Sequence, residues 1–366
     1  MSDPRTVQRS SLETPAPALT RGRRVPLWLG LTALGALLLF LELALGSVRI
    51  PFGQVLRILF GAEAEKGSWS TIVLVFRLPR ALTALLAGAG LAVSGLQMQT
   101  LFRNPLAGPS ILGIGSGASL GVAIVVLGLG ATDTSRFLGG IGLGGELASV
   151  LAAGLGAGAV LFLVLAASRR VRSAVTLLIL GVLFGYATNA VVSILLHFSV
   201  AERIQTYISW TFGSFGGTTW GQMWIFAPIV VVAIVAAQLS RKPLNGLLLG
   251  ETYAHSMGVD VRRARALVIA TTAVLTGVVT AFCGPIGFLG VAVPHMARGL
   301  FGTSDHRLLL PATAVIGGVV ALAADLVAQL PGTQTVLPLN AVTALIGAPV
   351  VALIILRRRS LKEAFA

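Results

Sequence analysis

Uninterrupted apolar runs recur along the chain. The first extends from Leu27 to Gly46, and as a helix rising ~1.5 Å per residue it would cross ~30 Å of hydrocarbon. The apolar region of a cleaved signal peptide is usually shorter, so we interpret this run as a retained span. Nine further spans are predicted at 81–101, 106–129, 146–167, 174–197, 221–239, 264–283, 288–301, 309–329 and 336–356. The pattern predicts an all-α, polytopic membrane protein with about ten transmembrane helices.

Two short breaks qualify this count. Segments 102–105 and 284–287 contain proline or glycine and interrupt otherwise continuous apolar sequence. The span at 288–301 is short, so eight or nine full spans are an alternative. An even number of spans places both termini on the same side of the membrane.

Outside the spans, two segments are predicted to lie on the outer surface. Apolar residues in 52–60 follow helical spacing after Pro51, and 200–213 precedes several tryptophans. We expect short surface helices there that seal the outer face. Within the spans, small residues at every fourth position predict close helix packing; these are Gly113, Gly117 and Gly121, and Gly154 and Gly158.

The charge distribution supports a membrane protein and its orientation. Only 11% of the 366 residues are charged and 55% are hydrophobic, whereas a soluble domain carries about 25% charged residues. This excludes an ordinary soluble enzyme and a disordered chain. With the N-terminus in the cytoplasm, 20 of the 27 lysines and arginines fall inside and 7 outside. The net charge of +14 therefore reflects membrane topology, and no nucleic-acid partner is expected.

The chain divides into three regions on this basis. Residues 1–26 hold five arginines and four prolines and are predicted to be a disordered, basic cytoplasmic tail. Residues 27–359 form the membrane domain, and residues 360–366 are a cytoplasmic C-terminal tail. Both termini are expected on the cytoplasmic side of the membrane.

Reactive groups are scarce. The chain has no P-loop and a single cysteine, Cys283, so it offers neither an ATP-binding loop nor an internal disulfide. No cluster has metal-ligand spacing, and we expect no cofactor. Three carboxylates lie in or beside apolar runs: Glu42, Glu146 and Asp325. All three are near predicted outer ends, where we expect them to reach water or a helix terminus, with Asp325 the best candidate for another role.

Ordered motifs in both halves resemble one family. The first half contains Arg77-Leu-Pro-Arg80-Ala-Leu, Gly88-Ala-Gly-Leu-Ala-Val-Ser-Gly95-Leu-Gln-Met-Gln99, Asn104-Pro-Leu-Ala107 and Leu112-Gly-Ile-Gly-Ser-Gly117. The second contains Leu249-Gly-Glu251, Ser256-Met-Gly258, Gly284-Pro-Ile-Gly287, Val293-Pro-His295, Asp305-His-Arg307 and Ala324-Asp325. From about residue 27 to 359 the chain is similar to the FecCD-type permeases of bacterial ABC importers for ferric siderophores, haem and cobalamin.

The resemblance implies an architecture and a set of partners. The implied fold is the ten-helix, inverted-repeat permease of type II ABC importers. A weak internal echo agrees: Arg77-x-x-Arg80-Ala-Leu and Arg262-x-x-Arg265-Ala-Leu each precede an apolar run, on opposite predicted sides. The implied partners are a second permease subunit, identical or paralogous, two separate ATPase subunits, an extracytoplasmic binding protein and membrane lipid. A ferric siderophore is the expected substrate, with haem or cobalamin as alternatives.

The resemblance also assigns a cytoplasmic coupling loop. Segment 245–263 would form short helices that dock on the ATPase, with Gly250, Glu251, Ser256 and Gly258 as its motif residues. From residue type alone, Gly258 is predicted to end a short helix and Asp260 to cap the next one. A solvated loop is the alternative interpretation.

Two further sites carry alternatives. Ser173 and Thr176 match the family's cytoplasmic gate, but Ser173 also has the chemistry of a helix N-cap. Arg77 and Arg80 match positions that contact the binding protein, but they also suit arginines that snorkel at the lipid interface. Where the family commonly has another outer arginine this chain has Gln329, which implies a lost ion pair or a substitute from Arg136 or Arg203.

Two other functions compete with the importer. An ion-coupled secondary transporter would have similar inverted repeats but needs titratable groups near the bilayer midplane. A membrane-embedded enzyme has only His295, His197 and the carboxylates as candidates. We therefore expect a transport subunit and not an enzyme.

Overall fold

The computed structural model describes residues 21–129, 145–171, 173–333 and 335–357. Seven helices in this described part are long and apolar enough to cross a membrane. They are α1 (Arg21–Ala44), α4 (Leu78–Leu101, extended at its start by α3 and η1), α7 (Gly145–Arg170), α8 (Ala174–His197), α10 (Trp220–Leu239), α13 (Val261–Cys283) and α15 (His306–Ala328). Helix α1 begins six residues earlier than the predicted span, so the end of the predicted tail is helical.

Three shorter helices complete the predicted set. They are α5 (Ile114–Ala123, continued by the π-helix η3, Ile124–Leu129), α14 (Leu289–Phe301) and α16 (Leu339–Arg357). Each of the ten predicted runs therefore contains a helix. Helix α14 has 13 residues and is about 20 Å long, which is too short to cross the hydrocarbon alone.

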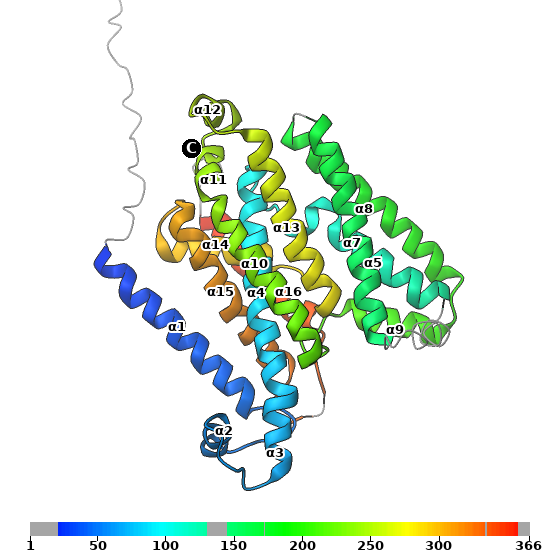
Figure 1. Ribbon diagram of the computed structural model, residues 1–366, viewed down its shortest axis with the longest axis vertical. Coiled ribbons are helices and arrows are strands. Elements are labelled where there is room, and N and C mark those ends of the chain that lie inside the picture. Colours follow the sequence, from blue (N-terminus) through cyan, green and yellow to red (C-terminus); the bar gives the residue numbers. More distant parts are fainter. Residues whose placement is uncertain (1–20, 130–144, 172, 334, 358–366) are drawn as a thin grey trace, which may run out of the picture.

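The remaining short helices lie at the two ends of the bundle. Helices α2 (Phe52–Leu59), α3 (Gly67–Thr71) and η1 (Ile72–Arg77) lie opposite α11 (Arg241–Leu248) and α12 (Glu251–Ser256) (Figure 1). Helix α9 (Ala201–Thr211) follows α8, and η2 (Pro109–Leu112) precedes α5. The two predicted surface helices are thus present as α2 and α9. In α2, Val55 and Ile58 are buried while Leu56 and Leu59 are exposed.

Helix α4 runs through the middle of the bundle, with α1 along one flank and α7 and α8 along the other (Figure 1). It packs against α15, α13, α14 and α10. Glycine makes this approach possible: a Cβ on Gly95 would lie 1.6 Å from the carbonyl oxygen of Gly290, and one on Gly88 would lie 2.2 Å from that of Gly317. Backbones this close admit no larger residue without a shift of the helices.

The predicted packing glycines divide into two groups. Gly117 and Gly121 face α7 at close range, and a Cβ on Gly121 would lie 2.0 Å from the carbonyl oxygen of Ala152. Gly113 adopts φ +74° and precedes α5. Gly154 and Gly158 have nothing within 4 Å of a built Cβ, so the packing prediction is wrong for them. They lie instead along a groove on α7 that faces α13.

The repeated Arg-x-x-Arg-Ala-Leu motif makes similar contacts at its two positions. Arg80, at the start of α4, forms an ion pair with Asp325 near the end of α15, the helix that packs along α4. Arg265, near the start of α13, donates to the carbonyl of Val171, just beyond the end of α7, which packs along α13. The second arginine of each motif therefore contacts the end of a neighbouring helix.

Candidate functional site

Helices α11 and α12 form the segment that joins α10 to α13. Helix α11 buries Leu244 and Leu247, and α12 buries Ala254. Between them Gly250 adopts φ +107°, a conformation that side-chain-bearing residues rarely adopt, and it turns the chain into α12. The predicted coupling loop is therefore a pair of anchored helices and not a solvated loop.

The predicted helix end at Gly258 and helix cap at Asp260 are confirmed, whereas the predicted start at Asn245 lies inside α11. Ser256 is the last residue of α12 and donates to the carbonyl of Tyr253 at 2.8 Å, and Gly258, two residues later, has φ +79°. Asp260 caps α13 by accepting from the Arg263 amide at 3.0 Å. The segment thus has fixed stops at both ends of α12.

The exposed side of the segment mixes apolar and polar side chains. Leu249, Tyr253 and Met257 are each at least half exposed, and Thr252, His255 and Ser256 are exposed beside them. Three large apolar side chains on a short helical surface suit contact with another protein.

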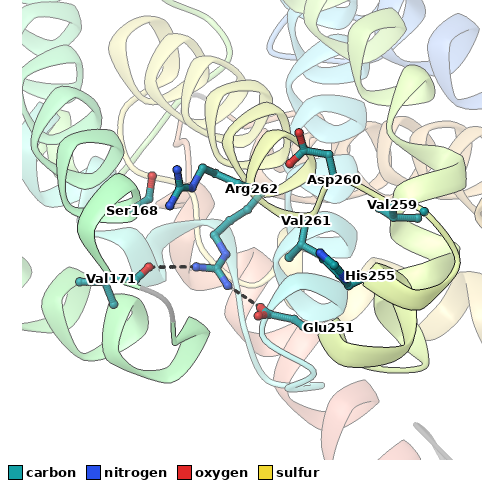
Figure 2. Close-up of a pocket in the computed structure, with 10 residues that line it drawn as sticks. Ser168, Val171, Glu251, His255, Val259, Asp260, Val261 and Arg262 are labelled. Carbon is teal, nitrogen blue, oxygen red and sulfur yellow. Dashed lines mark hydrogen bonds and ion pairs between the residues drawn. The ribbon is translucent and has the colours of Figure 1, made fainter.

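Beneath the segment lies a cavity of about 850 Å³ (Figure 2). Its lining includes Ser168 and Val171 from the end of α7, Glu251 and His255 from α12, and Arg262 and Arg265 from α13. The Arg265 guanidinium donates to Glu251 Oε1 at 2.5 Å and to the Val171 carbonyl at 3.1 Å. Arg265 is 7% exposed and Glu251 38% exposed. One buried cation therefore joins the segment to both α7 and α13.

The gate residues lie at the start of α8, just beyond the end of α7. Ser173 Oγ accepts from the Thr176 amide at 3.4 Å, so the predicted capping of α8 is confirmed. Both side chains are exposed at the start of α8. The gate assignment itself stays a prediction.

A buried polar cluster occupies the opposite end of the bundle. Arg80 forms two bonds to Asp325, at 2.7 and 2.8 Å. Gln329 donates to Glu42 at 2.7 Å and to Asp325 at 3.2 Å. These four side chains tie together α1, α4 and α15.

This cluster corrects the expectation for the intramembrane carboxylates. Glu42 is 0% and Asp325 is 1% exposed. The prediction that they could reach water is therefore wrong for both. A buried charge persists only when it is paired, and Arg80 supplies that pair. The side chain of Glu146 lies outside the described residues.

The outer arginines also have partners within the chain. Arg77 is buried and donates to the carbonyls of Leu43 and Val48 at 2.8 and 2.5 Å. Arg203 donates to the Leu127 carbonyl at 3.2 Å, and Arg136 lies outside the described residues. Snorkelling into the lipid interface does not describe Arg77 or Arg80, because both guanidinium groups point into the fold. Their docking role stays a prediction.

Helix α8 is the least buried of the long spans, with 17% of its apolar window inside the structure. Tyr186, Asn189 and Ser193 share one helical face, and all three are exposed. Polar side chains at membrane depth face a water-filled cavity or another protein surface and not lipid. The described part of the chain leaves this face of α8 exposed, so a covering from elsewhere is expected.

The two histidines considered as catalytic candidates contact neighbouring residues of the same chain. His295 is buried with Nε2 2.8 Å from the Pro105 carbonyl, and His197 lies edge-on against Phe198. In the described part of the chain, no group of three or more His, Cys, Asp or Glu residues has the geometry to hold a metal ion.

Comparison with known proteins agrees with this architecture over most of the chain. Residues 34–357 match the model of the FecCD transport family. The vitamin B12 import system permease protein BtuC of Klebsiella pneumoniae is 39% identical over 92% of this chain and 96% of its own length. BtuC of Citrobacter koseri is 37% identical over 93% and 98%.

A solved structure extends the agreement to three dimensions. A metal-chelate type ABC transporter in an inward-facing conformation superposes with a TM-score of 0.78 at 28% identity, over 91% of this chain and 99% of the other. The match to the family model thus begins within α1 and ends with α16, a range that contains the α11–α12 segment and both arginine motifs. This chain belongs to the FecCD transport family.

Proposed function

We propose that this chain is the transmembrane permease subunit of an ATP-driven importer whose cargo is cobalamin. The observation that carries the proposal is the α11–α12 segment, which is anchored inside by Arg265 and Leu244 and exposes Leu249, Tyr253 and Met257. A sequence without a P-loop needs an ATPase on another chain, and this surface provides a place for it. The segment then lies in the cytoplasm, with both termini on that side.

The path for the cargo would lie along α8. Its exposed Tyr186, Asn189 and Ser193 suit a water-filled passage between two permease subunits, since a passage for a bulky chelate needs polar but uncharged walls. Ser173 and Thr176, at the cytoplasmic start of the same helix, would narrow this passage. The second subunit would cover the face of α8 that the described residues leave exposed.

The cargo assignment follows the relatives. A ferric siderophore, the expectation from sequence, receives no specific support from them, whereas BtuC proteins are named for vitamin B12 import and align over nearly the whole chain. Cobalamin is also a metal chelate, in keeping with the description of the structural neighbour.

On the outer face, an extracytoplasmic binding protein would deliver the cargo. Arg77 and Arg80 hold α1, α4 and α15 together through Leu43, Val48 and Asp325. We infer that both arginines hold the outer face in shape. Reversal of their charge would therefore weaken docking of the binding protein mainly by changing the shape of this surface.

The test is reconstitution of the permease with its genomically adjacent ATPase and binding protein in liposomes. We expect ATP-dependent uptake of radiolabelled cyanocobalamin and little uptake of a ferric hydroxamate siderophore. A matched vesicle with an ATPase lacking its Walker lysine should take up neither. Uptake of the siderophore alone would contradict the cargo, and failure of the ATPase to bind the permease would contradict the whole proposal.

A further inference from the structure

We propose that Asn245, His306 and Thr100 form a hydrogen-bonded relay that carries movement of the coupling segment into the membrane helices. Asn245 is on α11, His306 begins α15, and Thr100 lies in the last turn of α4. The inference rests on the proposed role of α11 and α12 in contacting an ATPase, and it identifies the positioning residues that such coupling requires.

Asn245 forms the cytoplasmic end of the relay. Its amide nitrogen donates to Asp305 Oδ1 at 2.7 Å, which fixes the orientation of the amide because a carboxylate only accepts. Its oxygen then accepts from the His306 backbone amide at 2.9 Å and lies 2.8 Å from His306 Nδ1. Burial acts to raise the pKa of Asp305, but hydrogen bonds from the Arg307 amide and from Asn245 hold this pKa below its usual value.

His306 connects this end to the bundle. Because Nδ1 faces an amide oxygen, Nδ1 carries the hydrogen, and in the neutral ring Nε2 is left to accept. Nε2 lies 2.9 Å from the Thr100 hydroxyl, which also lies 3.0 Å from the Leu96 carbonyl. His306 and Thr100 are both 0% exposed. Water is therefore not at hand to replace either bond.

A second connection to α4 lies at the start of α11. The Gln97 amide donates to Thr271 at 2.9 Å and to Ser240 at 3.3 Å, and Ser240 directly precedes α11. The last turns of α4 are thus bonded to α11 at its start through Gln97 and at its middle through Thr100 and His306. Helix α11 also packs directly on α4 and α15.

These contacts differ from apolar packing in one respect. Apolar contacts have no fixed partner atoms, whereas a buried polar atom that loses its hydrogen-bond partner, here Nε2 of His306, carries a penalty. A displacement of α11 therefore has to move α4 and the start of α15 with it or break a buried bond. Since α4 is the central helix, the relay reaches the part of the bundle with the most neighbours.

The alternative is that these hydrogen bonds only stabilise the fold. A second buried threonine in α4, Thr83, provides a matched control for this alternative. Thr83 is also 0% exposed and donates to the carbonyl four residues earlier, at 2.7 Å, but it lies at the far end of the helix from α11. Thr100→Val and Thr83→Val remove the same hydroxyl with nearly the same volume. Only the first breaks the relay.

The measurement is cyanocobalamin taken up per ATP hydrolysed, in liposomes containing the complete transporter. We expect Thr100→Val to lower this ratio at least about threefold while binding-protein-stimulated ATP hydrolysis continues. Thr83→Val should leave the ratio unchanged, and Thr100→Ser should restore it. An unchanged ratio in Thr100→Val, or an equal loss in Thr83→Val, would overturn the relay.

A second break tests the connection from its other end and guards against misfolding of one variant. Asn245→Ala, at a half-buried position, should lower the ratio as much as Thr100→Val does. The double variant should be no worse than either single one, because a chain broken once transmits nothing further. Additive losses would overturn the relay. A wild-type complex that neither assembles nor consumes ATP would instead contradict the proposed function.

Discussion

Glu251→Arg is expected to abolish ATP-driven uptake. Glu251 accepts from Arg265 at 2.5 Å, and the reversal would place two guanidinium groups at that contact. Arg265 is 7% exposed, so its charge would lose its partner in a poorly solvated place. Loss of a bond to a charged group costs about 2 kcal/mol before like-charge repulsion is added. Displacement of α12 should follow, with uptake lowered about tenfold or more.

Two control variants separate charge from contact. Glu251→Gln keeps an acceptor for Arg265 and should retain most of the uptake. The exchange Glu251→Arg with Arg265→Glu restores an ion pair but leaves the Val171 carbonyl without its donor, so recovery should be partial. Uptake and ATPase binding are measured together in liposomes and in detergent. Normal uptake by Glu251→Arg would remove this contact from the coupling account.

Asp325→Asn is expected to cause the largest loss of stability. The substitution leaves the Arg80 guanidinium, 19% exposed, without the carboxylate that it bonds, and it disturbs Gln329, which also donates to Glu42. Removing one partner of a buried ion pair costs about 3–5 kcal/mol. The expected result is a markedly lower midpoint of thermal unfolding in detergent, with less protein recovered from the membrane.

A paired replacement provides the control for this variant. Arg80→Met with Asp325→Leu removes both charges at similar volume, and such replacements of buried pairs are often neutral or stabilising. The double variant should therefore be more stable than Asp325→Asn. Transport per folded molecule should persist in both, because neither group is proposed to carry an ion. Equal unfolding midpoints for wild type and Asp325→Asn would show that the pair does not stabilise the fold.

Features encoded in short stretches were predictable from sequence. Each predicted apolar run contains a helix. Such runs are recognisable because the thickness of the hydrocarbon and the rise per helical residue together set how many apolar residues a span needs. The caps at Ser173 and Asp260 followed from side chains that bond an amide three residues ahead. The surface helix α2 followed from its periodicity.

Long-range partners were not predictable in the same way. Arg80 and Asp325 are 245 residues apart, and nothing in either neighbourhood indicates the other. Glu42 near the end of an apolar run suits a water-exposed position equally well, and its burial depends on α15 packing beside α1. Gly154 and Gly158 have the same spacing as Gly117 and Gly121, yet only the latter two face a helix at close range. Spacing identifies a face but not its neighbour.

The relay residues illustrate the same limit. His306 belongs to a motif of the family resemblance and Thr100 directly follows another, but their pairing arises from the packing of α4 on α15. Asn245 would pass for an ordinary turn residue beside Gly246. Only their three-dimensional arrangement makes them one chain of hydrogen bonds.

The energy source of transport tests the central claim most directly. Liposomes containing the complete transporter and internal ATP would be treated with a protonophore and a sodium ionophore, and cyanocobalamin uptake would be followed. An ATP-driven permease predicts uptake that continues after both gradients collapse and stops when ATP is removed. Uptake that stops with the gradients, or that proceeds without ATP, would contradict the account and favour an ion-coupled transporter.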